Sequence, residues 1–160
     1  MVPLRSAATK PVPATNKKKN YCFACGLDNR EGLRLIFQYD PKTISAFCRL
    51  KIDPKYQGAT GFAHGGMIAT LLDEAMAKVN GLGGIMAVTL NLTVSYRKMV
   101  PVSKELLLTG RRVTKRGRKL YLRSELKLNS DVLADARGLF LTVQPEMFNP
   151  TSESRSRRSS

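Results

Sequence analysis

The stretch GFAHGGMIATLLDEAMAKV, residues 61–79, decides the fold, because its periodicity is that of one long apolar helix. From Gly65 onward, apolar side chains recur every three or four positions, at Met67, Ile68, Leu71, Leu72, Ala75, Met76 and Val79. Glycines at positions 81, 83 and 84 predict where the helix ends. Its apolar stripe is too continuous for a surface helix, so we expect the helix to lie inside the fold.

Segments that alternate polar and apolar residues flank this helix and predict β-strands. Two precede it, at residues 33–38 and 44–51, with a turn at residues 40–42. Four follow, at residues 85–98, 105–115, 118–129 and 132–143, and the turn signals between them indicate a β-meander. Strands joined by short turns are antiparallel neighbours, and an apolar sheet face needs a cover. The order therefore predicts an α+β fold, an antiparallel sheet curled around one central helix.

Charge is distributed unevenly along the 160 residues, which carry 27 Lys and Arg against 12 Asp and Glu, a net charge of +15. Residues 1–20 and 149–160 are basic and lack apolar periodicity, which predicts two disordered arms, although the acid-free first arm also suits a transit peptide. The domain predicted at residues 21–148 keeps a net charge of +8. This surplus requires an anionic partner: nucleic acid, a membrane surface, or a phosphorylated small molecule such as coenzyme A.

Cysteine and hydropathy patterns bear on the compartment. No apolar run is long enough to span a membrane, and the N-terminus lacks an apolar signal core. Three cysteines are too few, and odd in number, for a disulfide framework, so we expect a cytoplasmic protein. Cys22 and Cys25 form a CxxC pair, but only Cys48 and His64 remain as further zinc ligands, so we expect packing thiols and no metal.

The start of the helix, His64-Gly65-Gly66, is the first candidate for chemistry. Unpaired N–H groups at a helix N-terminus can stabilise a carbonyl oxygen that develops negative charge. Alternatively, the glycines only make the turn into the helix and His64 is a capping or packing residue. The sequence alone leaves both interpretations open.

Two adjacent acids, Asp73 and Glu74, interrupt the apolar helix. Asp73 shares a face with apolar residues, and partial burial would raise its pKa, as suits a general base. The alternative places both acids on an exposed polar stripe with Lys78, which we expect for Glu74. Gly65 and Asp73 are about 12 Å apart along one helix. If both act on one reacting atom, the second must come from another subunit, which predicts a dimer with sites at the interface.

The densest charge run of the predicted domain is the turn Lys115, Arg116, Gly117, Arg118 and Lys119. Four cations and a flexible glycine make a compact anion site, or else a solvated hairpin tip. The nearby basic residues that would extend such a patch are Arg97, Lys98, Arg111 and Arg112.

The run HGGMIATLLDEA, with Asp73 nine residues after His64, resembles the hotdog-fold acyl-CoA thioesterases of the phenylacetate-degradation type and the mammalian thioesterase-superfamily members. The likeness covers residues 21–143. CFACGLDNREGL is similar to the CFxCGxxNPxGL opening of one branch, with Arg30-Glu31 where Pro is usual. The resemblance implies a homodimer or homotetramer that hydrolyses acyl-CoA to free acid and CoA. It implies no separate cofactor, because CoA is part of the substrate.

The resemblance also implies residue roles. Asp73 would activate water or attack the thioester carbonyl, the Gly65 N–H would polarise that carbonyl, His64 would place the loop, and the Thr89 hydroxyl would orient the water or the carboxylate. Relatives with this motif hold the phosphates of CoA at the turn that matches residues 115–119. Some carry Asn or Gln about six residues before the motif His, where this chain has Gly58 beside Gln57.

Strict alternation in AVTLNLTVSY places Thr89 with Asn91 and Thr93 on one face, opposite Leu90, Leu92 and Val94. We include Asn91 among the candidate CoA-binding residues. Three alternatives to hydrolysis remain: binding of acyl-CoA without turnover, hydration of an enoyl thioester, and, remotely, nucleic-acid binding. For the last, the chain lacks a recognition motif and an aromatic stacking platform.

Overall fold

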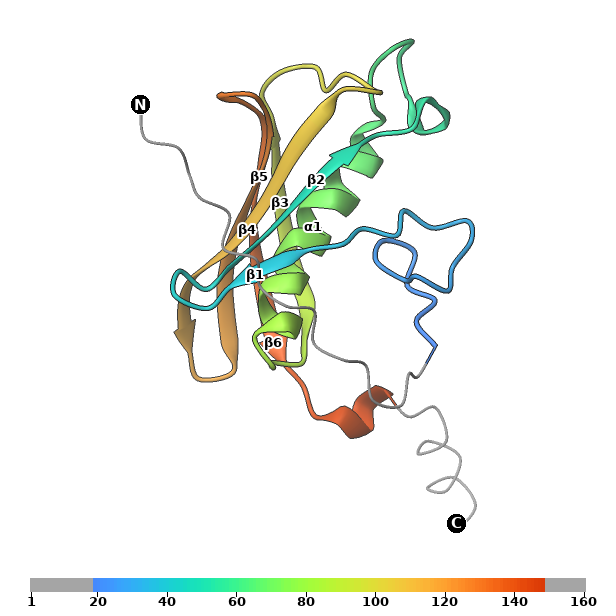
Figure 1. Ribbon diagram of the computed structural model, residues 1–160. Coiled ribbons are helices and arrows are strands. Elements are labelled where there is room, and N and C mark those ends of the chain that lie inside the picture. Colours follow the sequence, from blue (N-terminus) through green and yellow to red (C-terminus); the bar gives the residue numbers. More distant parts are fainter. Residues whose placement is uncertain (1–18, 149–160) are drawn as a thin grey trace, which may run out of the picture.

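An antiparallel six-stranded sheet wraps one long helix in the computed structural model, which describes residues 19–148 (Figure 1). The strands are β1 (Gln38–Asp40), β2 (Ser45–Lys51), β3 (Ala87–Tyr96), β4 (Glu105–Arg116), β5 (Lys119–Leu128) and β6 (Asp131–Thr142). The helix is α1 (Gly65–Leu82), and two short 3₁₀ helices are η1 (Pro54–Tyr56) and η2 (Pro145–Phe148). The predicted α+β plan is confirmed, and α1 begins and ends where the apolar periodicity and the glycines indicate.

Helix α1 lies against one face of the curved sheet and contacts every strand from β2 to β6 (Figure 1). Leu71, Leu72 and Met76 on α1 are at most 1% exposed, which confirms a helix buried in the core. Gly110 on β4 lies directly beneath the helix, because a Cβ there would come within 2.4 Å of the Ala75 carbonyl oxygen. The backbones of helix and sheet thus approach so closely that β4 accommodates only a glycine at this point.

The first predicted strand, at residues 33–38, is wrong in its position. Strand β1 begins only at Gln38, because the backbone of the preceding residues bonds elsewhere. The Leu33 N–H donates to the Phe23 carbonyl (2.8 Å) and the Leu35 N–H to the Ala24 carbonyl (2.9 Å). The alternation in this segment therefore reflects packing under an N-terminal loop rather than pairing in the sheet.

The predicted meander is wrong in one strand. The sheet order is β1-β2-β4-β5-β6-β3, so β3 pairs with β6 at one edge and not with β4. The connection at residues 97–104 is held against the loop that precedes α1: Val100 is 2% exposed and accepts a hydrogen bond from the Ala63 N–H (2.8 Å). This connection crosses the end of the sheet instead of making a tight turn. It leaves the ten-residue β3 at an open edge.

The described residues include only part of the segments that define the predicted domain boundaries. The tail at residues 149–160 and residues 1–18 of the arm lie outside the described residues. Asn20, assigned to the arm, belongs to the fold, because its backbone N–H donates to Asp28 Oδ2 (2.7 Å). Within residues 19–148, no helix is both long enough and apolar enough to cross a membrane.

Candidate active site

His64 caps the start of α1. Its Nδ1 accepts a hydrogen bond from the Gly66 N–H (3.0 Å), so a neutral ring carries its proton on the exposed Nε2. The Tyr96 hydroxyl donates to the Gly65 carbonyl (3.0 Å) and ties the end of β3 to this turn. The Gly65 N–H, in the first turn of α1, has no acceptor among residues 19–148. The interpretation of His64 as a helix-capping residue is thus confirmed. The Gly65 N–H remains free to polarise a carbonyl.

Asp73 and Thr89 meet between the middle of α1 and β3. The Thr89 hydroxyl donates to Asp73 Oδ1 over 2.9 Å. Burial raises the pKa of the Asp73 carboxyl above its ordinary value, the Thr89 hydrogen bond lowers it, and the neighbouring Glu74 charge raises it further. The geometry brings together two of the predicted site residues and makes Asp73 a stronger base than an exposed carboxylate.

A β-bulge separates Thr89 from Asn91. Thr89 is paired with Phe140 and Asn91 with Leu139, so Leu90 has no partner on β6. Phe140 is fully buried on the helix side of the sheet, whereas Leu139 lies on the outer side. The prediction that Thr89 and Asn91 share one face is therefore wrong. The bulge places Thr89 toward the helix and Asn91 on the outer face.

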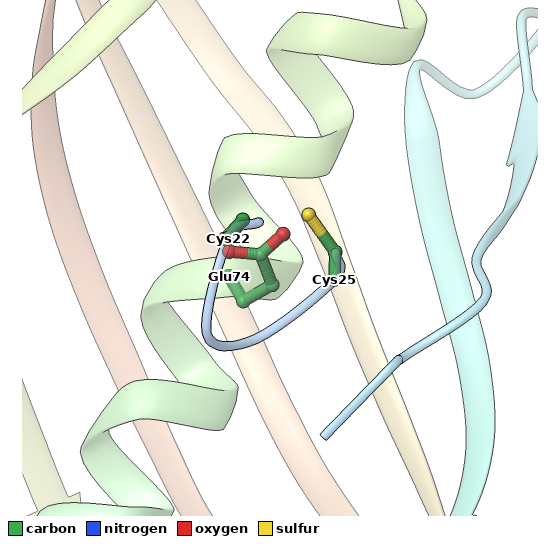
Figure 2. A group of neighbouring side chains, drawn as sticks. All are labelled: Cys22, Cys25 and Glu74. Atoms are coloured by element: carbon green, nitrogen blue, oxygen red, sulfur yellow. The ribbon is translucent and has the colours of Figure 1, made fainter. Parts of the chain in front are cut away.

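Glu74 is less exposed than predicted. It makes the expected ion pair with Lys78 (3.5 Å), but its side chain is only 13% exposed. An N-terminal loop that carries Cys22 and Cys25 covers this part of α1 (Figure 2). Burial, followed by the Glu74 carboxylate, raises the pKa of the Cys25 thiol to about 11. Cys25 is therefore protonated at neutral pH and is a poor nucleophile.

A hollow of about 540 Å³ opens on the outer face of the sheet. Its polar lining includes Asn91 and Thr93 from β3, Arg116 from β4, Arg123 from β5 and Arg137 from β6. Two of the predicted CoA-binding residues, Asn91 and Arg116, thus line one cavity.

The remaining residues of the basic turn take other positions. Arg118 donates to the Thr142 carbonyl (3.1 Å) and fixes the turn to β6. Gly117 adopts a φ of 54°, which a two-residue hairpin with glycine at its first central position requires. Lys115 and Lys119 are exposed on the flanking strands.

Three arginines stand side by side across the outer face, and sequence reasoning missed two of them. Arg111 on β4 is directly opposite Arg123 on β5, which is directly opposite Arg137 on β6. Like charges in such positions repel one another, so the row favours a bound anion. The residue pairing counted outward from the hairpin turn could have revealed the row. That pairing, however, shifts by one residue at a second bulge, between Arg112 and Thr114.

Two other basic residues do not extend this patch. Arg97 pairs with Asp135 and Lys98 with Asp131 (3.1 Å), and both acids belong to β6. Gln57 also has a structural partner, because its Oε1 accepts from the Gly61 N–H (3.1 Å) and closes the loop before α1.

Known proteins resemble this chain in sequence and in fold. A model of the thioesterase superfamily matches residues 60–134. The mouse (Mus musculus) acyl-coenzyme A thioesterase THEM5 is 30% identical over 118 residues, which cover 72% of this chain and 48% of that protein. The chain thus spans about half the length of this curated relative.

Two solved structures show the same hotdog fold. A thioesterase superfamily protein superposes with a TM-score of 0.72 at 24% identity, over 81% of this chain and 72% of its own. A Streptococcus mutans protein, solved bound to acetyl-CoA, gives a TM-score of 0.63 at 23% identity, over 68% of this chain and 88% of its own.

Proposed function

This chain belongs to the thioesterase superfamily, and from that premise we propose that it hydrolyses acyl-CoA thioesters to a carboxylic acid and free CoA. The observation that carries the proposal is the Thr89–Asp73 hydrogen bond of 2.9 Å. It fixes a carboxylate of raised basicity at the open edge of the sheet. The curated relative named above is an acyl-CoA thioesterase, which supports the same substrate class.

Asp73 acts in its ionised form. As a general base it takes a proton from water, whose oxygen adds to the thioester carbonyl; the C–S bond then breaks, and the proton passes to the CoA sulfur. As a nucleophile it attacks the thioester carbonyl, the C–S bond breaks and CoA leaves as thiolate, which gives a mixed anhydride between Asp73 and the acyl group. Water then hydrolyses the anhydride to the carboxylic acid and the free Asp73 carboxylate, and a proton from that water passes to the CoA sulfur. Thr89 holds Oδ1, which leaves Oδ2 to meet the water or the carbonyl. The N–H of Gly65 stabilises the negative charge on the carbonyl oxygen.

The active unit is a homodimer built on the β3 edge. In one chain, the Thr89 end of β3 holds Asp73, and the Tyr96 end holds Gly65 through the Tyr96 hydroxyl. If β3 pairs antiparallel with its copy across a two-fold axis, the Thr89 end of one chain meets the Tyr96 end of the other. Asp73 of one chain then approaches Gly65 of the next, which removes the 12 Å separation expected within a single helix.

Exposed apolar side chains along this edge support the same pairing. Leu90 is 52% exposed, Tyr96 56% and Met99 58%. A ten-residue edge strand with apolar side chains and free backbone groups is a template for another strand. Dimers of this kind can assemble further into a tetramer.

The phosphates of CoA bind in the outer hollow. Arg123 and Arg137 offer guanidinium groups in adjacent strands, Arg116 adds a third from the hairpin end, and Asn91 supplies an amide. The basic surplus of the domain therefore serves an anionic small molecule rather than nucleic acid. The three free thiols further support a reducing compartment such as the cytoplasm.

Release of free thiol from a panel of acyl-CoAs tests the function. We expect Asp73→Asn to lose at least about a hundredfold in kcat, in line with the loss of a general base, and to keep its circular dichroism spectrum. Asp131→Asn is the matched control, since Asp131 is exposed at the start of β6 and, among residues 19–148, its ion pair is with Lys98. Unchanged turnover by Asp73→Asn would exclude the assignment. If the wild type binds acyl-CoA but releases no thiol, the protein is an acyl-CoA-binding protein. If it hydrates an enoyl-CoA instead, it is a hydratase.

A further inference from the structure

Three metal-ligating side chains converge where the N-terminal loop covers α1 (Figure 2). Cys22 and Cys25 come from the loop and Glu74 from the middle of the helix, and their ligand atoms all lie within 4.8 Å of one another. The proposed hydrolysis uses none of them. Sequence reasoning considered only Cys48 and His64 as partners for the CxxC pair, but Cys48 is buried in β2 and His64 caps α1.

The loop holds both thiols in fixed positions. The Gly26 N–H donates to the Cys22 carbonyl (2.8 Å), and a Cβ on Gly26 would lie 2.5 Å from the Cys22 nitrogen and oxygen, so the turn is too tight for a side chain. Asn20 accepts from the Cys22 N–H (3.1 Å) and points its amide at Cys25 Sγ (3.9 Å). Ala24, between the thiols, is 4% exposed and anchors the loop in the core. The loop backbone is therefore fixed so that both thiols lie near Glu74, as a preorganised metal site requires.

The charge at this position stays balanced when a divalent cation replaces the thiol protons. In the metal-bound state two thiolates and the Glu74 carboxylate carry three negative charges, and Lys78 pairs with Glu74 (3.5 Å). A divalent cation together with Lys78 neutralises all three. With one divalent ion bound, the cluster therefore has no net charge.

We propose that Cys22, Cys25 and Glu74 bind one zinc ion, with water as the fourth ligand. Thiolate donors select zinc over magnesium and calcium, and a carboxylate is an ordinary third ligand. Around tetrahedral zinc, donor atoms lie about 3.3–3.8 Å apart. Because the present donor atoms lie within 4.8 Å of one another, the cluster must contract by about 1.5 Å at most. Binding converts both thiols to thiolates and releases two protons to solvent. The ion fastens the N-terminal loop to α1 beside Asp73.

Zinc content measured without any acyl-CoA tests this proposal separately from the hydrolytic function. The full chain is stripped with a chelator under reducing conditions, titrated with zinc chloride against a competing chromophoric chelator, and assayed by mass spectrometry of the metal after gel filtration. We expect one zinc per chain in the wild type and none in Cys22→Ser or Cys25→Ser. Glu74→Gln should bind at least about tenfold more weakly. Cys48→Ala, which also removes one thiol, should retain zinc.

Cobalt substitution distinguishes the loss of a metal ligand from a general loss of stability. We expect the cobalt-loaded wild type and Cys48→Ala to show thiolate-to-cobalt charge-transfer absorption, and the Cys22 and Cys25 variants to lack it while keeping the wild-type circular dichroism spectrum. A reduced wild type that takes up no zinc above background would overturn the proposal. So would equal loss of zinc in Cys48→Ala, or a Cys22–Cys25 disulfide that forms in place of metal binding.

Discussion

Replacement of Gly110 by alanine tests how closely α1 lies on the sheet. The new Cβ would lie 2.4 Å from the Ala75 carbonyl oxygen and 3.1 Å from the Met76 nitrogen, whereas ordinary contacts begin near 3.4 Å. Both neighbours are helix backbone, which cannot rotate away as a side chain can. The helix and β4 must therefore separate by about 1 Å at this point.

Two opposing effects set the size of the change. Alanine gains about 0.5–1 kcal/mol over glycine inside a strand, because the unfolded chain loses less entropy. Overpacking a core costs about 1–3 kcal/mol, and contact with rigid backbone places this site at the upper end. We expect a net loss of about 2 kcal/mol in the free energy of unfolding. With the urea dependence usual for small proteins, the midpoint should fall by about 1 M.

Urea unfolding followed by circular dichroism, at one fixed protein concentration, measures the effect. Gly81→Ala is the control, because a Cβ there meets nothing within 4 Å and the residue lies in the last turn of α1. It should gain about 0.5–1 kcal/mol. Gly110→Ala should also lose thiol release, since the displaced helix carries Asp73. A Gly110→Ala protein as stable as the wild type would refute the close helix–sheet approach.

Further predictions concern the carboxylate, the arginine row and a buried hydroxyl. In the proposed mechanism Asp73 acts when ionised, so we expect kcat/KM to fall as the pH drops through its raised pKa. Thr89→Val removes a hydrogen bond that lowers this pKa, and the acidic limb of the profile should move to higher pH. An acidic limb that stays at the same pH would show that Thr89 does not influence the pKa of the catalytic base. Arg123→Gln should raise KM for acyl-CoA about tenfold with kcat unchanged, and equal KM values at low and high salt would contradict phosphate binding in the hollow. Ser124 is 1% exposed and its hydroxyl has no partner among the described residues, so Ser124→Ala should raise the free energy of unfolding by about 1 kcal/mol, and a lower urea midpoint would argue against the orphaned hydroxyl.

Local signals in the sequence predicted the helix and most strand ends. The periodicity from Met67 to Val79 and the glycines after it depend only on neighbouring residues, and so do the hairpin turns at Gly117 and Ser130. Strand order depends on pairing between distant segments. The alternation in β3 is the same whether its partner is β4 or β6, so the sequence did not reveal the crossover.

The part of the site that belongs to a known motif with fixed spacing could be predicted from the sequence. Asp73 and Thr89 come together as the resemblance implied, although their catalytic roles stay predictions. The burial of Glu74 was missed, because it depends on a loop about 50 residues earlier in the chain that folds back over the helix. The arginine row was missed because bulges, which no Gly or Pro marks here, set the register across β4, β5 and β6.

The bulge at Leu90 lets a single edge strand serve both faces of the sheet. With strict alternation, Thr89 and Asn91 would point the same way, and either the Asp73 carboxylate would lose its hydroxyl partner or the outer hollow would lose an amide. One extra residue reverses the phase between them, so Thr89 reaches under the helix and Asn91 faces the basic hollow. Under the proposed hydrolysis, the single strand β3 thus contributes to the reacting site through Thr89 and to the phosphate site through Asn91.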